Sequence, residues 1–214
     1  MDFGAYDGLI FDLDGTLIDS AYIWEEIDRI FFSKRGLPVP EDYAESVATM
    51  DLYDAAVYTK KLAGLDESPE QMIAEWGGLA EYEYANNIRP VPMAPRFLES
   101  MHSRGKKIAL ATASNEKLYT AVLKSNGMYG HFDCFVTTAD VPRGKEHPDI
   151  YLLAAERLGL SPERCLVFED KLPCVRAARR GGFAAAACLF GASESEAEAL
   201  RREADFTFSD YSEL

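Results

Sequence analysis

Short apolar segments alternate with helical patterns along most of the chain, and this alternation predicts the fold class. Strands are predicted for the apolar runs at residues 8–11, 107–111, 134–137, 165–168, 183–188 and 206–208. Helices are predicted from apolar residues at helical spacing at about residues 116–125, 149–158, 175–180 and 194–202. Strands that alternate with helices favour an α/β fold, here a Rossmann-like parallel sheet with helices on both faces.

The segment between the first and second predicted strands has a different pattern. The stretch SAYIWEEIDRIFFSKRG has apolar residues at helical spacing, with Asp19 or Ser20 as the expected N-cap and Gly36 as the stop. Further helical patterns follow at about residues 51–63 and 69–85. We therefore expect an α/β core domain made of residues 1–18 and 90–214, and an inserted helical domain of residues 19–89.

The charge of the chain limits its partners. Lysine and arginine number 22 and acidic residues 36, which gives a net charge of −14. A surface this acidic repels phosphate backbones and anionic lipids, so neither a nucleic-acid nor a membrane partner is expected. A small anionic substrate remains compatible with this charge if a local cation receives it.

Cysteine spacing and the terminal sequence predict a cytoplasmic protein. No two of the cysteines have CxxC spacing, which favours free thiols in a reducing compartment. The first residues, MDFGAYDGLIFDLDG, have no basic region typical of a signal peptide. The most apolar stretch, residues 182–192, is far shorter than the roughly 20 residues of a membrane helix.

Acids and hydroxyls follow several of the predicted strands. These residues are Asp12 and Asp14 after the first strand, Thr112 and Ser114 after the second, and Glu169 and Asp170 after residues 165–168. A single acid after a strand is often only a helix N-cap, but the carboxyl ends of parallel strands meet at one edge, which indicates a site. Clustered carboxylates need a cation, and the oxygen ligands Asp12, Asp14 and Asp170 suit Mg²⁺.

Histidine and lysine positions refine this site. The three histidines are scattered and no Cys/His ligand set is evident, which disfavours zinc. Lys145 follows a turn at residues 142–144, just before a predicted helix. It is either a cation that binds anionic oxygen at the site or an ordinary surface lysine.

Four motifs in order resemble those of the haloacid dehalogenase (HAD) superfamily. FDLDGTLIDS is similar to the first motif, DxDGT after a hydrophobic strand, and LATASN to the second, in which Thr112 ends a strand. KEHPDIY, with Lys145, resembles the third, and VFEDKLPCVRAARRGG, with Glu169 and Asp170, resembles the fourth. The resemblance spans nearly the whole chain and identifies residues 19–89 with the helical cap domain that this family inserts after the first motif.

The resemblance implies a phosphoryl-transfer mechanism on the acids. Asp12 would be the nucleophile that forms an aspartyl-phosphate, and Asp14 the general acid that protonates the leaving alcohol and then activates water. Mg²⁺ would be held by Asp12, Asp170 and Asp14, the last through its backbone carbonyl, and Glu169 is a further candidate ligand.

The same resemblance assigns the phosphate-binding groups. Thr112 and Ser114 would bind the transferring phosphoryl group, and Lys145 would offset the negative charge of nucleophile and phosphate together. The implied function is a Mg²⁺-dependent phosphatase that hydrolyses a small phosphorylated metabolite. We expect a monomer, because the cap must move. The family's dehalogenases lack the second acid, so Asp14 favours phosphate chemistry.

Departures from related mutases favour hydrolysis. Phosphomutases resembling β-phosphoglucomutase carry a histidine twelve residues after the nucleophile, where this chain has Trp24. They also carry an arginine in a cap loop whose counterpart here, residues 46–50, has no cation. Glu146 replaces the usual proline after the third-motif lysine. A sugar phosphomutase remains the alternative enzyme, and a HAD-fold protein that binds a phosphorylated ligand without turnover is the alternative outside enzymes.

Two further residues have two interpretations each. Trp24 either lines the substrate site from the cap or packs in the cap's own core. Lys171 is either a second phosphate-binding cation or a residue at a helix N-terminus that points to water.

Overall fold

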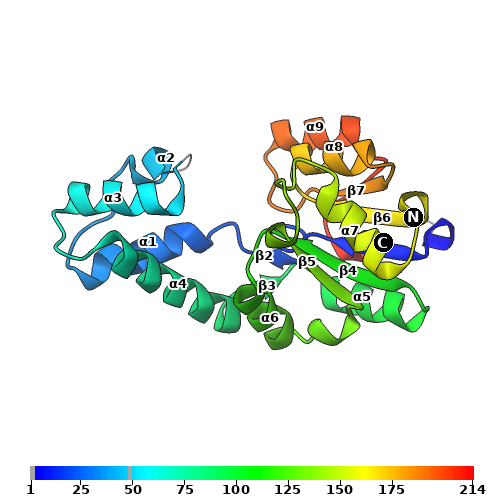
Figure 1. Ribbon diagram of the computed structural model, residues 1–214, viewed down its shortest axis with the longest axis horizontal. Helices are drawn as coiled ribbons and strands as arrows, with labels where there is room; N and C mark the ends of the chain where they lie inside the picture. The colour runs from blue at the N-terminus through cyan, green and yellow to red at the C-terminus, as the bar shows by residue number, and fades with distance from the viewer. Residues whose placement is uncertain (1–2, 48–49) are drawn as a thin grey trace. The chain divides into compact units, whose positions relative to one another are not determined.

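The computed structural model describes residues 3–47 and 50–214 and divides the chain into two compact units. One consists of Met1–Ala21 with Ile88–Leu214, and the other of Tyr22–Asn87. The first is an α/β domain and the second is helical (Figure 1). The helical unit begins three residues later than the insertion expected from the sequence, because Asp19 lies in a strand of the first unit.

A parallel sheet forms the centre of the α/β unit. Within the described residues it has six strands in the order β5-β4-β1-β6-β7-β8, and each neighbouring pair is parallel. Their bounds are β1 Gly8–Phe11, β4 Lys107–Thr112, β5 Cys134–Thr137, β6 Cys165–Glu169, β7 Ala184–Cys188 and β8 Phe206–Phe208. Every residue of β1 and β6 is buried, as expected for strands covered on both faces. The predicted α/β fold is confirmed.

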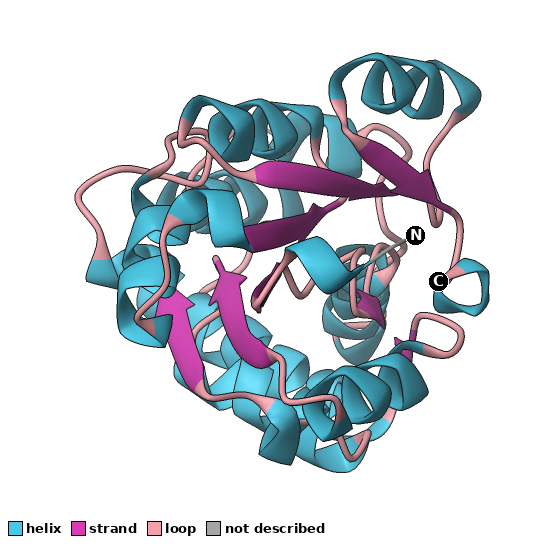
Figure 2. Ribbon diagram, turned by 90° about the vertical axis from the view of Figure 1, so that its right-hand side faces the viewer, coloured by secondary structure: helices cyan, strands magenta, loops and turns pink. Residues whose placement is uncertain are grey.

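Helices cover both faces of this sheet (Figure 2). Their bounds are α5 Ala94–Ser103, α6 Glu116–Ser125, α7 Asp149–Leu158, α8 Leu172–Arg180 and α9 Glu194–Glu203, with 3₁₀ turns at Phe3–Ala5, Tyr129–His131, Thr138–Asp140, Pro162–Arg164 and Tyr211–Glu213. On one face α7, α8 and α9 pack on small strand residues such as Ala109 and Ala185. On the other face Phe97 of α5 contacts the rings of Phe11 and Phe168.

A short antiparallel ribbon is absent from the sequence prediction. It pairs β2, Ile18–Asp19, with β3, Arg89–Pro90. Two-residue strands are too short to show a period of two, so their apolar pattern carries no signal. The expected N-cap of the next helix was also wrong, because that helix starts after Tyr22 and the Ser20 hydroxyl bonds Asp14 instead.

The helical unit has its own apolar core. It contains α1 Ile23–Lys34, α2 Tyr43–Val47, α3 Leu52–Ala63 and α4 Pro69–Asn86. Asp51 and Ser68 cap α3 and α4 through their side chains. The Trp76 ring lies 5.4 Å from Phe31, and both side chains are buried. The unit is thus stabilised by contacts among its own helices.

Two findings bear on cellular setting. In the described part of the chain no helix has both the length and the apolar character that a bilayer crossing requires. The four cysteines, all in described residues, carry free thiols. The expected free thiols are therefore present.

Candidate active site

The sheet changes winding direction at β1, which places a site at its carboxyl end. β1 lies between β4 and β6, with Phe11 in register with Leu110 on one side and Phe168 on the other. Ligands of open α/β sheets bind at such a switch point, outside the carboxyl ends of the strands. Asp12 follows β1 directly, and its backbone N–H donates to the Phe168 carbonyl at 2.9 Å.

Lys145 connects the acids that follow β1 and β6. Its ammonium contacts Asp12 Oδ1 and lies 2.5 Å from Glu169 Oε1, and the three side chains are nearly buried. Tyr151, on the first turn of α7, donates from its hydroxyl to the same Glu169 oxygen at 2.8 Å. Lys145 is therefore a fixed cation of the site and not a surface lysine.

Burial and charge set the ionisation of this cluster. Burial raises the pKa of Asp12 to about 7, although Lys145 opposes the shift. Burial alone would lower the pKa of Lys145, but Asp12 and Glu169 outweigh it and raise that pKa. The lysine thus stays cationic beside a carboxylate that needs a positive neighbour to remain ionised at neutral pH.

The carboxylates also fit a divalent cation. Ligand oxygens of Asp12, Glu169 and Asp170 lie within 4.8 Å of one another. Asp170 Oδ1 is buried without a hydrogen-bond partner, and burial raises the pKa of this carboxyl to about 6. A buried, unpartnered oxygen among acids is costly unless a cation binds it. These residues therefore fit Mg²⁺, which prefers oxygen ligands.

Gly15 makes room for Asp170. Its φ of 85° lies in the left-handed region, and a Cβ added there would be 2.4 Å from Asp170 Oδ2. The turn of the DxDGT sequence thus needs glycine for its backbone angle and for the close approach of a site carboxylate.

Asp14 has a different environment from Asp12. Its oxygens accept hydrogen bonds from the Ser20 hydroxyl at 2.8 Å and from the Ser114 hydroxyl at 2.7 Å. Thr112, at the end of β4 and fully buried, accepts from the Ser114 backbone N–H at 2.9 Å. Two hydroxyls hold one carboxylate in a part-buried position, which suits a group that exchanges protons.

The structure brings most of the predicted site residues to one edge. Asp12, Lys145, Glu169 and Asp170 form the charged cluster already described. Thr112 at the end of β4, Ser114 two residues later and Asp14 in the turn after β1 form a group joined by hydrogen bonds. The prediction gave Ser114 to phosphate, whereas its hydroxyl here bonds Asp14.

The predicted cap residues lie in the other unit. Trp24, on the first turn of α1, is 55% exposed, so the interpretation as core packing is wrong. The cap loop compared with the mutases spans residues 46–50, and positions 48 and 49 lie outside the described residues.

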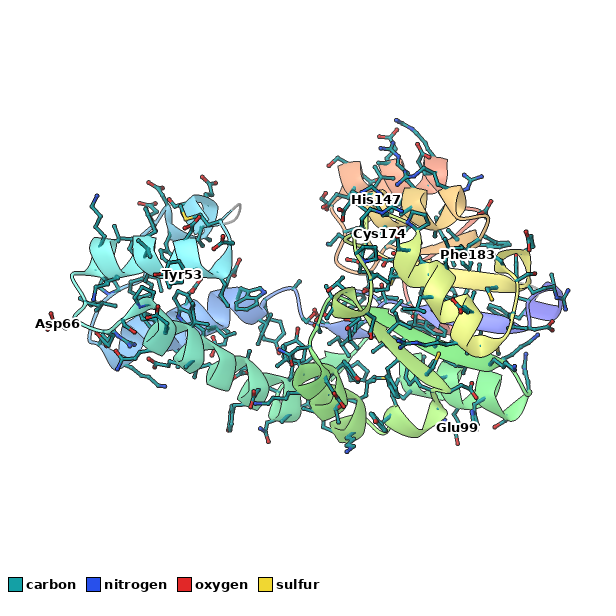
Figure 3. The ribbon with its side chains drawn as sticks, in the orientation of Figure 1. Tyr53, Asp66, Glu99, His147, Cys174 and Phe183 are labelled. Carbon is teal, nitrogen blue, oxygen red and sulfur yellow. The ribbon has the colours of Figure 1, made fainter. Side chains whose placement is uncertain are left out.

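Sequence reasoning missed two residues that position the acids. Ser20 was expected to cap a helix but instead donates a hydrogen bond to Asp14. A serine hydroxyl can do either, and only the folded turn after Gly15 brings it to Asp14. Tyr151 belongs to the KEHPDIY motif, and its place on the first turn of α7, six residues after Lys145, was the available signal. Cys174, labelled in Figure 3, comes from the first turn of α8.

The chain is similar in sequence to known phosphatases and in structure to solved proteins. The chain is 29% identical over 177 residues to fructose-1-phosphate phosphatase YqaB of Escherichia coli, covering 83% of this chain and 93% of the relative. It is 28% identical over 210 residues to validoxylamine A 7'-phosphate phosphatase of Streptomyces hygroscopicus, covering 98% and 96%. The structure of a candidate beta-phosphoglucomutase from Thermotoga maritima superposes with a TM-score of 0.83, at 25% identity and 94% coverage of both chains. The family model for haloacid dehalogenase-like hydrolases matches residues 6–182, so the chain belongs to that family of enzymes, as the motifs predicted.

Proposed function

We propose that this protein is a Mg²⁺-dependent phosphatase that hydrolyses a small phosphomonoester through an aspartyl-phosphate on Asp12. The observation that carries the proposal is that two acids, only two residues apart in the sequence, lie in different surroundings. Asp12 is buried and paired with Lys145, whereas Asp14 is held by two serine hydroxyls. Two carboxyls in separate environments suit separate roles, one as nucleophile and the other as proton donor and acceptor.

The two steps follow from these contacts. A carboxylate oxygen of Asp12 forms a bond to phosphorus while the bond to the ester oxygen breaks, and Asp14 gives its proton to the departing alkoxide. Asp14, now a carboxylate, then takes a proton from the water that attacks phosphorus and releases Asp12 with phosphate. Lys145 keeps Asp12 ionised and faces the same negative charge, and the Thr112 hydroxyl donates to the phosphoryl group.

Asp12, Asp170 and the backbone carbonyl of Asp14 would hold Mg²⁺. When bound, it would neutralise negative charge between the Asp12 carboxylate and the phosphoryl oxygens. Glu169 is a weaker candidate ligand, because Lys145 and Tyr151 already share one of its oxygens.

The substrate proposal uses the relatives' names. Several act on phosphorylated carbohydrates, among them fructose-1-phosphate phosphatase YqaB and the phosphorylated carbohydrates phosphatase of Thermotoga maritima. We extend this class to the present chain and assign substrate selection to the helical unit, acting as a cap. The exposed Trp24 ring is the cap residue proposed to contact substrate.

A metal-dependent assay tests the function. Protein treated with EDTA should lose p-nitrophenyl phosphate hydrolysis and regain it with Mg²⁺, and full activity without metal would refute the proposal. A panel of sugar phosphates identifies the substrate. Conversion of β-glucose 1-phosphate to glucose 6-phosphate, with no free phosphate released, would instead establish a phosphomutase.

A further inference from the structure

Lys171 lies at the catalytic edge but has no place in the reaction described above. It follows Asp170 directly and is the N-cap residue of α8. Its side chain is 67% exposed, yet its ammonium lies 2.9 Å from Asp170 Oδ2. The interpretation as a helix residue that only points to water therefore does not describe it, because the charge is held against a carboxylate of the site.

A lysine is a poor choice for helix stability at this position. Serine, threonine, aspartate and asparagine are the favoured N-caps, and the helix dipole disfavours positive charge at the N-terminus. Lys171 makes no side-chain capping bond to α8. The contact with Asp170 is thus the interaction that gives this ammonium a defined position.

That contact would weaken once the site is loaded. Asp170 is one of the proposed metal ligands, and a cation bound at its unpartnered Oδ1 would neutralise the carboxylate charge that holds Lys171 through Oδ2. The ammonium, on a side chain that is 67% exposed and next in sequence to Asp170, would then be available to another anion at this edge of the sheet. A negative group carried by the substrate itself would meet that need.

We propose that Lys171 determines specificity by binding a second anionic group of the substrate. This inference rests on the proposed phosphatase function and narrows it to phosphomonoesters that carry a carboxylate or second phosphate within a few atoms of the ester oxygen. The local cation would also explain how a chain with a net charge of −14 accepts a molecule with two anionic groups.

A matched pair of substrates tests this role. D-3-Phosphoglycerate and sn-glycerol 1-phosphate have the same configuration at C2 and differ only in a carboxylate against a hydroxymethyl group. Lys171→Met should lower the ratio of their kcat/KM values about five- to tenfold, the effect of a charge-assisted hydrogen bond reduced for an exposed side chain. Lys171→Arg should keep the ratio. Lys124→Met, which removes one positive charge from the last turn of α6, is the control and should also keep it.

Binding measured without turnover separates this inference from the parent proposal. In Mg²⁺, D-3-phosphoglycerate should raise the melting temperature of the inactive Asp12→Asn variant more than sn-glycerol 1-phosphate does, and adding Lys171→Met should abolish the difference. If Lys171→Met leaves both the kcat/KM ratio and the melting shifts unchanged, the specificity role is refuted. Unequal shifts, found with a wild-type protein that hydrolyses neither these two compounds nor p-nitrophenyl phosphate, would instead refute the phosphatase proposal alone.

Discussion

Replacing Asp14 with asparagine should separate the two chemical steps. The new amide keeps an oxygen that accepts from one serine hydroxyl, and the other hydroxyl can turn to accept from the amide N–H, so the contacts to Ser20 and Ser114 survive. Only the exchangeable proton is lost. The variant should therefore fold normally but fail wherever a proton must move.

The size of the loss depends on the leaving group. The alcohol of an alkyl phosphate would have to leave as a strongly basic alkoxide if no acid protonated it. Loss of the general acid should therefore lower the rate about 10²–10⁴-fold, which corresponds to roughly 3–5 kcal/mol of activation free energy. p-Nitrophenolate leaves without a proton, so Asp12 can still be phosphorylated, while the later attack of water lacks its base. The variant should release nitrophenolate in a rapid burst equal to the enzyme concentration and then turn over slowly.

Stopped-flow absorbance with p-nitrophenyl phosphate measures the burst, and phosphate release from glycerol 3-phosphate measures the alkyl reaction. Asp12→Asn is the matched control, since it makes the same chemical change two residues earlier and should show neither burst nor turnover. If Asp14→Asn shows no burst, or if its rate of Asp12 phosphorylation falls as much with the aryl ester as with the alkyl ester, the acid/base assignment is wrong.

Three further substitutions test the site, the helical unit and the cap. Gly15→Ala should raise the Mg²⁺ concentration needed for half-maximal activity, because the new Cβ would lie 2.4 Å from Asp170 Oδ2; a metal titration measures this. Asp28→Asn should stabilise the protein by about 1–2 kcal/mol above pH 6 and not at pH 4. Burial raises the pKa of Asp28 to about 6, so the ionised carboxylate destabilises the folded state only as the pH rises above the ordinary pKa of an aspartate. Urea unfolding at both pH values measures this, and an equal gain at pH 4 contradicts it. Trp24→Ala should reorder a substrate panel with little change in melting temperature, whereas the buried Trp76→Ala should cost about 3–5 kcal/mol in stability. An unchanged substrate ranking in Trp24→Ala would refute the proposed contact with substrate.

The α/β architecture was predictable because its elements are long and regularly patterned. The predicted bounds of α6, α7, β5 and β8 agree with the structure to the residue. The unpredicted α5, Ala94–Ser103, begins after Met93, which has a φ of 66°, and carries a proline in its first turn. Phe97 of this helix contacts the rings of Phe11 and Phe168. Tertiary contacts of this kind leave no local pattern in the sequence from which the helix could be predicted.

The site was predictable as a set of residues but not as a set of pairs. Parallel strands require their carboxyl ends to meet, so the acids after β1 and β6 had to converge. Which oxygen meets which donor depends on side-chain directions that the sequence does not encode locally. Tyr151 reaches Glu169 from another element, and Ser20 turns back to Asp14 across six residues.

The pairing of charges explains how such a cluster is compatible with folding. Asp12, Glu169 and Asp170 would repel one another at one edge of the sheet, at a cost that burial increases. Lys145 lies between the first two, and Lys171 holds the third. Three negative charges meet two positive ones, which leaves a local excess of one negative charge and an unpartnered oxygen on Asp170. The charges of this cluster are thus nearly balanced before any ligand arrives, and a divalent cation and a doubly charged phosphoryl group would bring equal and opposite charges, so they would not change that balance.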